Sequence, residues 1–446
     1  MSHVTDDGRL AFIATCDLVA LTRGRSIPAR DLAAKSRTGV GWVPADLALT
    51  TFGDIADPNR FGALGDIRLI PDGTRATLPA VGGRPRTDVV LASIVEPDGT
   101  PWACDPRTAL VDAVRALDAT GLHLKVAFEQ EFALLGADGH LGPSPAGLPV
   151  PPPFSLDAFR AAEPFGSELV SALYGAGLEP ENWLPEYGAG QFEITVGPAD
   201  PVTAADRAIL VRALVRDLAT AHGMRASFVP LLSPDAVGNG VHVHLSLWDA
   251  DGSPVTLDED GDLTTPAGRF AAGILAHAPA LIGWSAPSVI SSFRLAPHRW
   301  SSAAAFLGRQ NREAMLRICP VVTIGSNGQS GANLEFRAAD ATANPWLVAA
   351  ALIRAGLDGL TRELPSPAVL DMELDALDAE GRKRFGVTEI PRTQAAALAA
   401  IEADEIALGW FAEDLVATHL GIRRTEAALL ADLTPEEQCR RYADVI

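Results

Sequence analysis

Four short segments of the chain alternate apolar and polar side chains with the two-residue period of a β-strand. They are centred on Glu129-Gln130-Glu131, Gln191-Phe192-Glu193, His242-Val243-His244 and Glu335-Phe336-Arg337. Because successive side chains of a strand point to opposite faces, the outer residues of each triplet share a face. In the third segment the opposite face carries Val241, Val243, Leu245 and Leu247. The pattern predicts four strands, each with one apolar face and one ionisable face.

Turn residues divide the rest of the chain into two regions. Residues 10–98 hold short β-like runs, Leu10–Thr15 and Val89–Val95, between many Gly and Pro turns. Asp105 then provides an N-cap and Pro106 the first position of a helix that ends before Gly121. A strand is expected at 124–135, and helices at 156–176, 202–222, 266–283, 345–362 and 392–430. We predict an α+β protein with a small β-rich domain, 1–103, and a larger domain, 104–446.

Charge and composition limit the partners. With a formal net charge of −20, the chain lacks the basic surface that nucleic acid or an anionic membrane requires, so neither is expected as a partner. Its four cysteines are far apart and form no C-x-x-C pair, which favours neither a zinc site nor a disulfide scaffold. The first nine residues are polar and acidic, unlike a signal peptide. The apolar runs are too short to span a bilayer. A reduced, cytoplasmic protein is expected.

The ionisable strand faces indicate a metal site. Carboxylates brought together repel one another unless a cation lies among them. Hard oxygen donors with one or two imidazoles suit Mg²⁺ or Mn²⁺. The chain has no G-x-x-x-x-G-K-[ST] and no strand-borne G-x-G-x-x-G motif, so a nucleotide would be held by another device. We therefore predict a multi-metal enzyme site that handles charged substrates.

Taken in order, these segments resemble the glutamine synthetase superfamily from the first domain to the last helix. The matching elements are Glu129-Gln130-Glu131; Glu186 followed by Gly190-Gln191-Phe192-Glu193-Ile194; Gly238-Asn239-Gly240-Val241-His242-Val243-His244-Leu245-Ser246-Leu247; Arg294-Leu295-Ala296-Pro297 with Asn311-Arg312 and Arg317; Glu335-Phe336-Arg337 with Asn344-Pro345; and Ile390-Pro391-Arg392 to Tyr442. Each element alone is weak evidence for the resemblance, but six of them in the family's order are very unlikely to agree by chance.

The resemblance implies a role for each matching residue. Glu131, Glu186 and Glu193 would hold a first metal ion, and Glu129, His242 and Glu335 a second. Glu131, Gly238 and Arg294 would contact the acid substrate, and His244 would lie near the nucleotide phosphates. Arg312, Arg317 and Arg337 would meet the transferring phosphoryl group or the substrate carboxylate. The implied fold is a small β-grasp-like domain followed by a catalytic domain of antiparallel strands and helices.

The implied reaction is an ATP-dependent joining of a carboxylate to an amine. ATP phosphorylates the acid, and the acyl phosphate is attacked by the amine. Two anions meet in the first step, so divalent cations and arginines are what a catalyst must provide. The family usually assembles as stacked rings with sites at subunit junctions, so a homo-oligomer such as a double ring is expected by analogy.

Two departures from the family pattern concern the amine. Ammonia-using members carry an Asp in a first-domain loop and a Glu in a flap after the R-L-x-P-G element. Here Lys35 and Trp300 stand near those positions. A cation and an indole would remove the ammonium site and make room for an apolar body. The sequence therefore favours ligation of glutamate to an organic amine, as in γ-glutamylamide and γ-glutamylpolyamine synthetases.

Two other departures concern the acid. The stretch between Arg317 and Glu335 is about five residues longer than the family's usual spacing, and Val237 replaces a commonly polar residue before Gly238. The acid is thus glutamate or a close analogue. Two alternatives stay open: an ammonia-dependent glutamine synthetase, and a catalytically silent relative that binds glutamate or nucleotide and acts through protein contacts.

Overall fold

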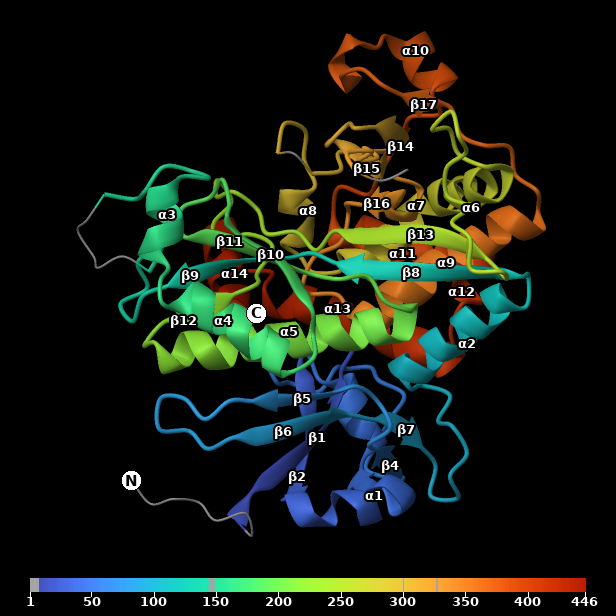
Figure 1. Ribbon diagram of the computed structural model, residues 1–446. Coiled ribbons are helices and arrows are strands. Elements are labelled where there is room, and N and C mark those ends of the chain that lie inside the picture. Colours follow the sequence, from blue (N-terminus) through green and yellow to red (C-terminus); the bar gives the residue numbers. More distant parts are fainter. Residues whose placement is uncertain (1–7, 144–148, 300, 326–327) are drawn as a thin grey trace.

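The computed structural model describes residues 8–143, 149–299, 301–325 and 328–446 (Figure 1). A small N-terminal domain lies beneath a larger domain in which helices surround two sheets. The predicted α+β class is confirmed.

The N-terminal domain has the topology of a β-grasp. Its first sheet has the order β2-β1-β6-β5, with β1 and β6 parallel in the centre, and a helix follows the first hairpin. The second sheet has the order β3-β4-β7. The elements are β1 (Leu10–Cys16), β2 (Thr22–Pro28), α1 (Leu32–Thr38), β3 (Val40–Trp42), β4 (Ile67–Ile70), β5 (Arg75–Leu78), β6 (Thr87–Leu91) and β7 (Ser93–Val95), with short 3-10 turns at Ala29–Asp31 and Pro44–Ala48.

The expected single run Val89–Val95 is wrong in one respect. The chain leaves the first sheet after Leu91 and joins the second at Ser93. Ala92 lies between them, buried, with its N–H donating to the Ala14 oxygen. Continuous apolar residues fit both halves because both sheets bury this segment, so periodicity alone could not locate the change.

Two sheets form the framework of the larger domain. One has the order β10-β11-β9-β12, and the other β17-β14-β15-β16-β13-β8, with β18 paired to β14. Their bounds are β8 (Leu122–Phe128), β9 (Gln130–Leu135), β10 (Pro180–Pro185), β11 (Gln191–Val196), β12 (Arg225–Ser227), β13 (Val243–Asp249), β14 (Ala304–Arg309), β15 (Ala314–Ile318), β16 (Leu334–Phe336), β17 (Val369–Leu370) and β18 (Thr388–Glu389). Most pairs are antiparallel as expected, but β14 pairs in parallel with β15 and β17.

The expected strand 124–135 is two strands that belong to different sheets. β8 pairs with β13, whereas β9 pairs with β11 and β12. Glu129 is the single residue between them, and its N–H donates to the oxygen of His242 at 3.0 Å. The candidate site therefore begins where the chain passes from one sheet to the other.

Most predicted helices are present, and three of them are interrupted. α2 (Pro106–Asp118), α5 (Pro201–Ala221) and α9 (Pro345–Thr361) match their predicted ranges closely. The expected 156–176, 266–283 and 392–430 each break into shorter helices, the first two at Pro164 and just before Pro279, as proline's missing N–H requires. The remaining helices are α3 (Leu156–Ala161), α4 (Phe165–Gly175), α6 (Thr265–Ala276), α7 (Ala278–Ser285), α8 (Ser291–Arg294), α10 (Ala379–Arg384), α11 (Gln394–Ala403), α12 (Glu405–Leu408), α13 (Glu413–Leu429) and α14 (Pro435–Ala443).

Helix α5 joins the two domains, since it lies between the N-terminal domain and the sheets of the larger one (Figure 1). Its buried Asp206 accepts two hydrogen bonds from Arg107 at 3.1 Å each, one from Trp346 at 2.7 Å, and two from Thr74 of the N-terminal domain at 3.0 Å. One carboxylate of α5 is thus hydrogen-bonded to α2, to α9 and to the N-terminal domain.

No helix in the described ranges is long and apolar enough to cross a membrane. The four cysteines are buried and unpaired.

Candidate active site

The carboxylates of the site come from the ends of strands in the four-stranded sheet. Glu131 on β9 and Glu193 on β11 are directly opposite residues of an antiparallel ladder. Glu186 lies just beyond β10, where its N–H donates to the oxygen of Gln191 at 2.8 Å. Like charges placed opposite one another destabilise a sheet unless a cation offsets them.

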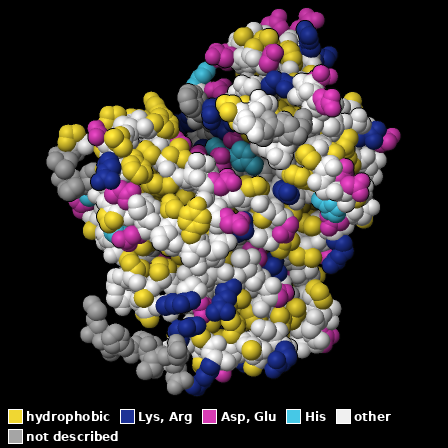
Figure 2. Space-filling model, in the orientation of Figure 1, with side chains coloured by type: hydrophobic (Ala, Val, Ile, Leu, Met, Phe, Trp, Pro, Cys, Tyr) yellow, Lys and Arg dark blue, Asp and Glu magenta, His cyan; other side chains and the backbone are white. Residues whose placement is uncertain are grey.

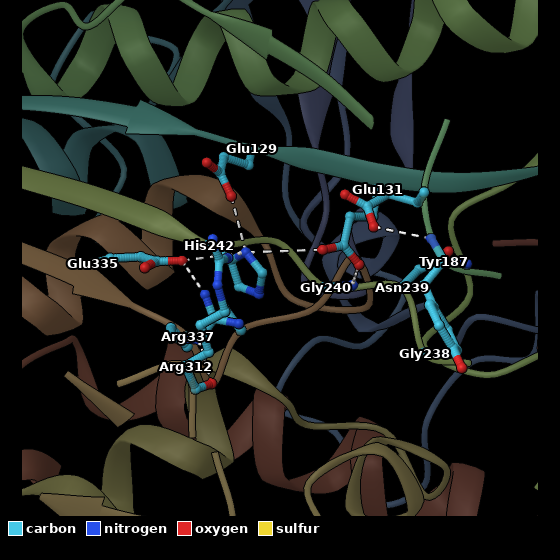
Figure 3. Close-up of polar contacts among 12 residues, drawn as sticks. Glu129, Glu131, Tyr187, Gly238, Asn239, Gly240, His242, Arg312, Glu335 and Arg337 are labelled. Carbon is cyan, nitrogen blue, oxygen red and sulfur yellow. Dashed lines mark hydrogen bonds and ion pairs between the residues drawn. The ribbon is translucent and has the colours of Figure 1, made fainter. Parts of the chain in front are cut away.

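The histidines and the last carboxylate come from the other sheet. His244 on β13 is paired with Glu335 on β16, which is in turn paired with Arg317 on β15. His242, one residue before β13, turns its Nδ1 to Glu129 at 2.9 Å, to Glu335 at 3.5 Å and to Glu131 at 3.8 Å. Figure 3 shows this ring between the three carboxylates. The ladder thus carries acid, imidazole and guanidinium side by side.

One group in this cluster has the spacing of a metal site. Ligand atoms of Glu129, His244 and Glu335 all lie within 4.8 Å of one another. His244 Nε2 lies 2.9 Å from Glu129. The sequence assigned His242 to this set and His244 to the nucleotide, and both rings are in reach of Glu129. Carboxylate oxygens with imidazole are donors that fit Mg²⁺ or Mn²⁺.

Burial and repulsion shift the protonation of the carboxylates. Burial, followed by the charges of Glu129, Glu131 and Glu186, raises the pKa of Glu193 to about 9. Burial and the charge of Glu131 raise the pKa of Glu186 to about 7. Ionising every carboxylate of the cluster would therefore place more negative charge there than its surroundings stabilise, which is the condition a divalent cation relieves.

The carboxylates beside the histidines shift in the opposite direction. Burial opposes ionisation of Glu335, but the charges of His242, Arg337 and His244 outweigh it and lower its pKa to about 2. Burial likewise opposes ionisation of Glu129, yet hydrogen bonds with both histidines bring its pKa well below the usual value. These two groups are anionic at neutral pH.

Two arginines donate hydrogen bonds to Glu335. Arg317 donates to one of its oxygens at 2.7 Å and Arg337 to the other. Arg337 also donates through Nε to the backbone oxygen of Arg312 at 2.9 Å (Figure 3). The Arg312 side chain is exposed. The three arginines form a cationic border on the cluster, suited to bind phosphate or carboxylate oxygens in pairs.

Arg294 lies under the glycine segment that precedes His242. It is buried and donates to the oxygens of Ala339 at 3.2 Å and Arg337 at 3.3 Å. A Cβ on Gly240 would lie 2.3 Å from Arg294 Nη2, and one on Gly238 would lie 2.9 Å from Arg294 Cγ. The Arg294 side chain packs directly against the backbone, with its guanidinium at Gly240 and its aliphatic part at Gly238, so a Cβ at either position would force it to move.

Three contacting residues were not among the sequence-predicted ligands. Gln191 donates to the oxygen of Gly238 at 2.8 Å and to Asn239 at 3.0 Å. Asn333 Oδ1 lies 2.8 Å from His244 Nδ1, and Cys319 Sγ lies 3.8 Å from Glu335. The alternation of β16 places Asn333 on the polar face with Glu335, which was a usable signal. Cys319 gave none, because no local pattern marks it as a neighbour of the carboxylates.

Only one of the two residues tied to amine choice lies in the described part of the chain. Trp300 lies outside the described residues. Lys35 is on α1, at the far end of the molecule from β13 and β16 (Figure 1). Lys35 therefore does not reach the cluster of its own chain.

A cavity of about 250 Å³ adjoins the cluster at Glu186 and Gln191. Its walls include Pro149–Pro153, Phe192 and the α3 residues Ala158 and Ala161. Figure 2 shows histidine side chains at the base of the central hollow of the larger domain. Metal-site donors and an apolar recess thus lie next to each other.

Family comparisons cover almost the whole chain. A model of the glutamine synthetase N-terminal domain matches residues 2–102, and a model of the glutamine synthetase catalytic domain matches residues 103–442. Fold and site define the class of protein, an ATP-dependent ligase. The chain belongs to the glutamine synthetase family, whose members use ATP and divalent metals.

Individual relatives include organic-amine and ammonia enzymes by name. A γ-glutamylpolyamine synthetase, GlnA3 of Streptomyces coelicolor, is 34% identical over 92% of this chain and 88% of its own. A glutamine synthetase of Halobacterium salinarum is 29% identical over 85% of this chain and 83% of its own. A crystal structure of a novel glutamine synthase homologue has a TM-score of 0.88 at 42% identity, covering 98% of both chains. A GmaS/ADP complex has a TM-score of 0.81 at 29% identity, covering 96% of both chains.

Proposed function

We propose that this protein joins the γ-carboxyl of L-glutamate, or of a close analogue, to an organic amine, with ATP cleaved to ADP and phosphate. The observation that carries the proposal is the junction at which Glu129, His242, His244 and Glu335 meet under the paired guanidinium groups of Arg317 and Arg337. The reaction must bring two anions together, the γ-phosphate and a carboxylate, and this junction combines arginines with donors for divalent cations that would offset their repulsion.

Each group has a proposed part in that reaction. Glu131, Glu186 and Glu193 would hold one divalent ion, and Glu129, Glu335 and either His242 or His244 another. The ions would neutralise phosphate charge and orient the phosphoryl group. Gly238 and Arg294, with Glu131, would position the acid substrate. Arg312, Arg317 and Arg337 would bind the charge that develops as the phosphoryl group moves to the acid.

The cavity beside Glu186 supports an organic amine over ammonium. Ammonium needs charged or polar neighbours, whereas most of the lining residues here are apolar or glycine, beside His140, Glu186 and Gln191. An amine with an apolar body would bury that body against the prolines and turn its nitrogen towards Glu186. One of the relatives named above is a polyamine ligase, and a polyamine would need a further carboxylate to pair with its second ammonium group. Among the described residues no carboxylate besides Glu186 lines the cavity, which favours a small alkylamine or amino alcohol.

A panel of amines tests the proposal directly. Phosphate release from ATP should require glutamate, Mg²⁺ or Mn²⁺ and an organic amine, with mass spectrometry showing the amide product. Equal rates with ammonium would instead support an ordinary glutamine synthetase, which several relatives are. No stimulation by any amine, with metal and ATP still bound, would favour the silent binding protein.

A cavity variant separates the amine question from the ligase question. Ala161→Leu should fill the recess and lower kcat/KM for a propylamine-sized substrate about 10-fold or more, while ammonium turnover, however slow, stays unchanged. The matched control is Ser171→Leu, because Ser171 is an exposed residue of α4 that does not line this recess. An equal loss in both variants would show that the recess does not hold the amine.

We also propose that the chain acts as a homo-oligomer with the domain division 1–103 and 104–446. Lys35 can meet an amine only at the site of a neighbouring subunit, because it lies far from its own. Light scattering on the purified protein tests the assembly. Oligomers mixed from Lys35→Glu and Glu335→Gln subunits test the shared site. Where the two variants adjoin, one junction combines the intact Lys35 of one subunit with the intact Glu335 of the other, so activity should be restored.

A further inference from the structure

A second cavity, of about 320 Å³, lies between the two domains and away from the carboxylate cluster. One wall is residues 20–23, at the turn between β1 and β2. The other is the face of α5 that carries Ile209, Arg212, Ala213 and Arg216. Three arginines thus converge on one recess from two domains. On the face shown in Figure 2, Lys and Arg side chains gather along the boundary between these domains.

The arginines keep hydrogen-bond donors to spare. Arg23 uses Nε on Asp17. Arg212 uses Nε on Gln130 at 2.9 Å and Nη1 on the oxygen of Ala341 at 3.1 Å, and Arg216 uses Nη2 on the oxygen of Ile446. Within the described residues, Nη2 of Arg212, Nε and Nη1 of Arg216 and both terminal nitrogens of Arg23 have no hydrogen-bond acceptor.

Burial shifts the pKa of two of these arginines. Arg212 is only 5% exposed, and burial lowers its pKa to about 10. Burial and then the charge of Arg212 lower the pKa of Arg216 to about 10. The acidic groups that act on these arginines are Asp17, which pairs with Arg23; Asp46, on which Arg23 also acts; and Cys16 and Asp340, which act on Arg212. None of the four lines the recess. The recess remains positive, so an entering anion would gain charge-assisted hydrogen bonds.

One of these arginines also contacts the strand segment that carries two candidate ligands, through a side chain on the opposite face of that segment. Arg212 Nε donates to the side chain of Gln130, which stands between Glu129 and Glu131 in sequence. Gln130 is 1% exposed, and its Nε2 has no partner among the described residues. A shift of Arg212 towards a ligand would therefore act on the residue that separates two proposed metal ligands.

We propose that this recess binds a small dianion, carrying phosphate or two carboxylates, and that its occupancy changes the metal affinity of the cluster. Arg23, Arg212 and Arg216 bind the anion. Arg212, as a positioning residue, passes its effect to Gln130. Anion binding to the recess can hold or fail separately from the proposed function, whereas the change in metal affinity rests on the metal site of the proposed function.

Calorimetric titration of metal-free, nucleotide-free protein with inorganic phosphate and with glutarate tests the site. Wild type should bind at least one of them, and Arg23→Gln and Arg216→Gln should each weaken that binding about 10-fold or more. Tighter binding of phosphate identifies a phosphate-bearing ligand, and tighter binding of glutarate a dicarboxylate. Two variants at different walls keep the test valid if one fails to fold.

Two controls locate the binding. Arg84→Gln removes an arginine that pairs with Asp217 of the same helix, and it should bind as wild type does. Arg312→Gln weakens anion binding at the active site and should leave the recess intact. Unchanged binding in Arg216→Gln, or a loss confined to Arg312→Gln, would overturn the site.

Manganese titration followed by electron paramagnetic resonance tests the coupling. A saturating anion should change the Mn²⁺ dissociation constant of wild type about 3-fold or more and leave that of Arg216→Gln unchanged. The anion also binds Mn²⁺ directly in solution, but this effect is the same for both proteins and so drops out when wild type is compared with Arg216→Gln. An equal effect in both proteins, or none in wild type, would overturn the coupling.

Discussion

Glu131 and Glu193 face each other across neighbouring antiparallel strands, at the same register position, in the middle of a buried cluster. Two carboxylates in this relation repel, and the pKa of Glu193, raised to about 9 by burial and neighbouring charges, shows the consequence. Such a pair favours either a proton on one of its members or a cation between the two.

Glu193→Gln should therefore separate metal binding from folding. Because Glu193 already favours its protonated form without metal, the amide should shift the metal-free Tm by no more than about 2 °C. The rise in Tm that wild type shows with millimolar Mn²⁺ should be largely lost. Glu181→Gln, an exposed change on β10 of the same sheet, should keep that rise. Differential scanning calorimetry measures both, and an undiminished Mn²⁺ effect in Glu193→Gln would contradict the assignment.

Gly240→Ala should impair use of the acid substrate. The new methyl group would meet Arg294 Nη2 at 2.3 Å, so the guanidinium must move. We expect kcat/KM for glutamate to fall about 10-fold or more, while ATP binding to the metal-loaded enzyme changes little. Gly175→Ala, where nothing lies within 4 Å of the added carbon, is the control. Steady-state kinetics that leave kcat/KM for glutamate unchanged would show that Arg294 does not hold the acid.

Asp206→Asn should destabilise the fold without touching the site. The substitution removes the closer and more buried of Arg107's two anionic partners and leaves only the exposed Asp72 at 3.4 Å, and losing one member of a buried pair costs about 3–5 kcal/mol. Asp217→Asn breaks a more exposed pair with Arg84 on the same helix and should cost less than about 1 kcal/mol. Urea unfolding followed by circular dichroism gives both values. Similar costs for the two variants would refute a central role for Asp206.

His419 should make the protein sensitive to acid. It is buried, stacks on Trp284, and donates through Nε2 to the Gly283 oxygen at 2.9 Å. Burial and then the charge of Arg423 lower its pKa to about 3. An unfolded histidine takes up a proton near pH 6.5, so this residue costs no stability above that pH. Below it the unfolded state binds one more proton, and stability falls by about 1.4 kcal/mol per pH unit down to about pH 3.

His419→Gln is the variant that checks this pH dependence. Glutamine can still donate to Gly283 but does not titrate, so the slope of unfolding free energy against pH should be shallower by about one proton between about pH 6 and pH 4. His123→Gln, at an exposed histidine, should keep the wild-type slope. Equal slopes in His419→Gln and wild type would show that His419 protonates without unfolding.

The sequence predicted most of the framework, because alternation, caps and glycine turns are local signals. Asp105 and Pro106 placed the start of α2 correctly, and the polar faces of four strands contained the ionisable residues that the structure brings together. The strand that divides at Glu129 was missed, since both halves bury apolar residues with the same period and only long-range pairing distinguishes them. Cys319 and the recess around Arg212 depend on contacts between distant segments, which no local pattern records.

Glu129 belongs to neither sheet, yet its two oxygens meet histidines that precede and begin β13. The one residue that separates the two sheets along the chain is thus held by side chains of the sheet that contains β13. A change in the register between the two sheets would reach the carboxylate–histidine contacts directly, although the apolar residues of both sheets share one continuous core.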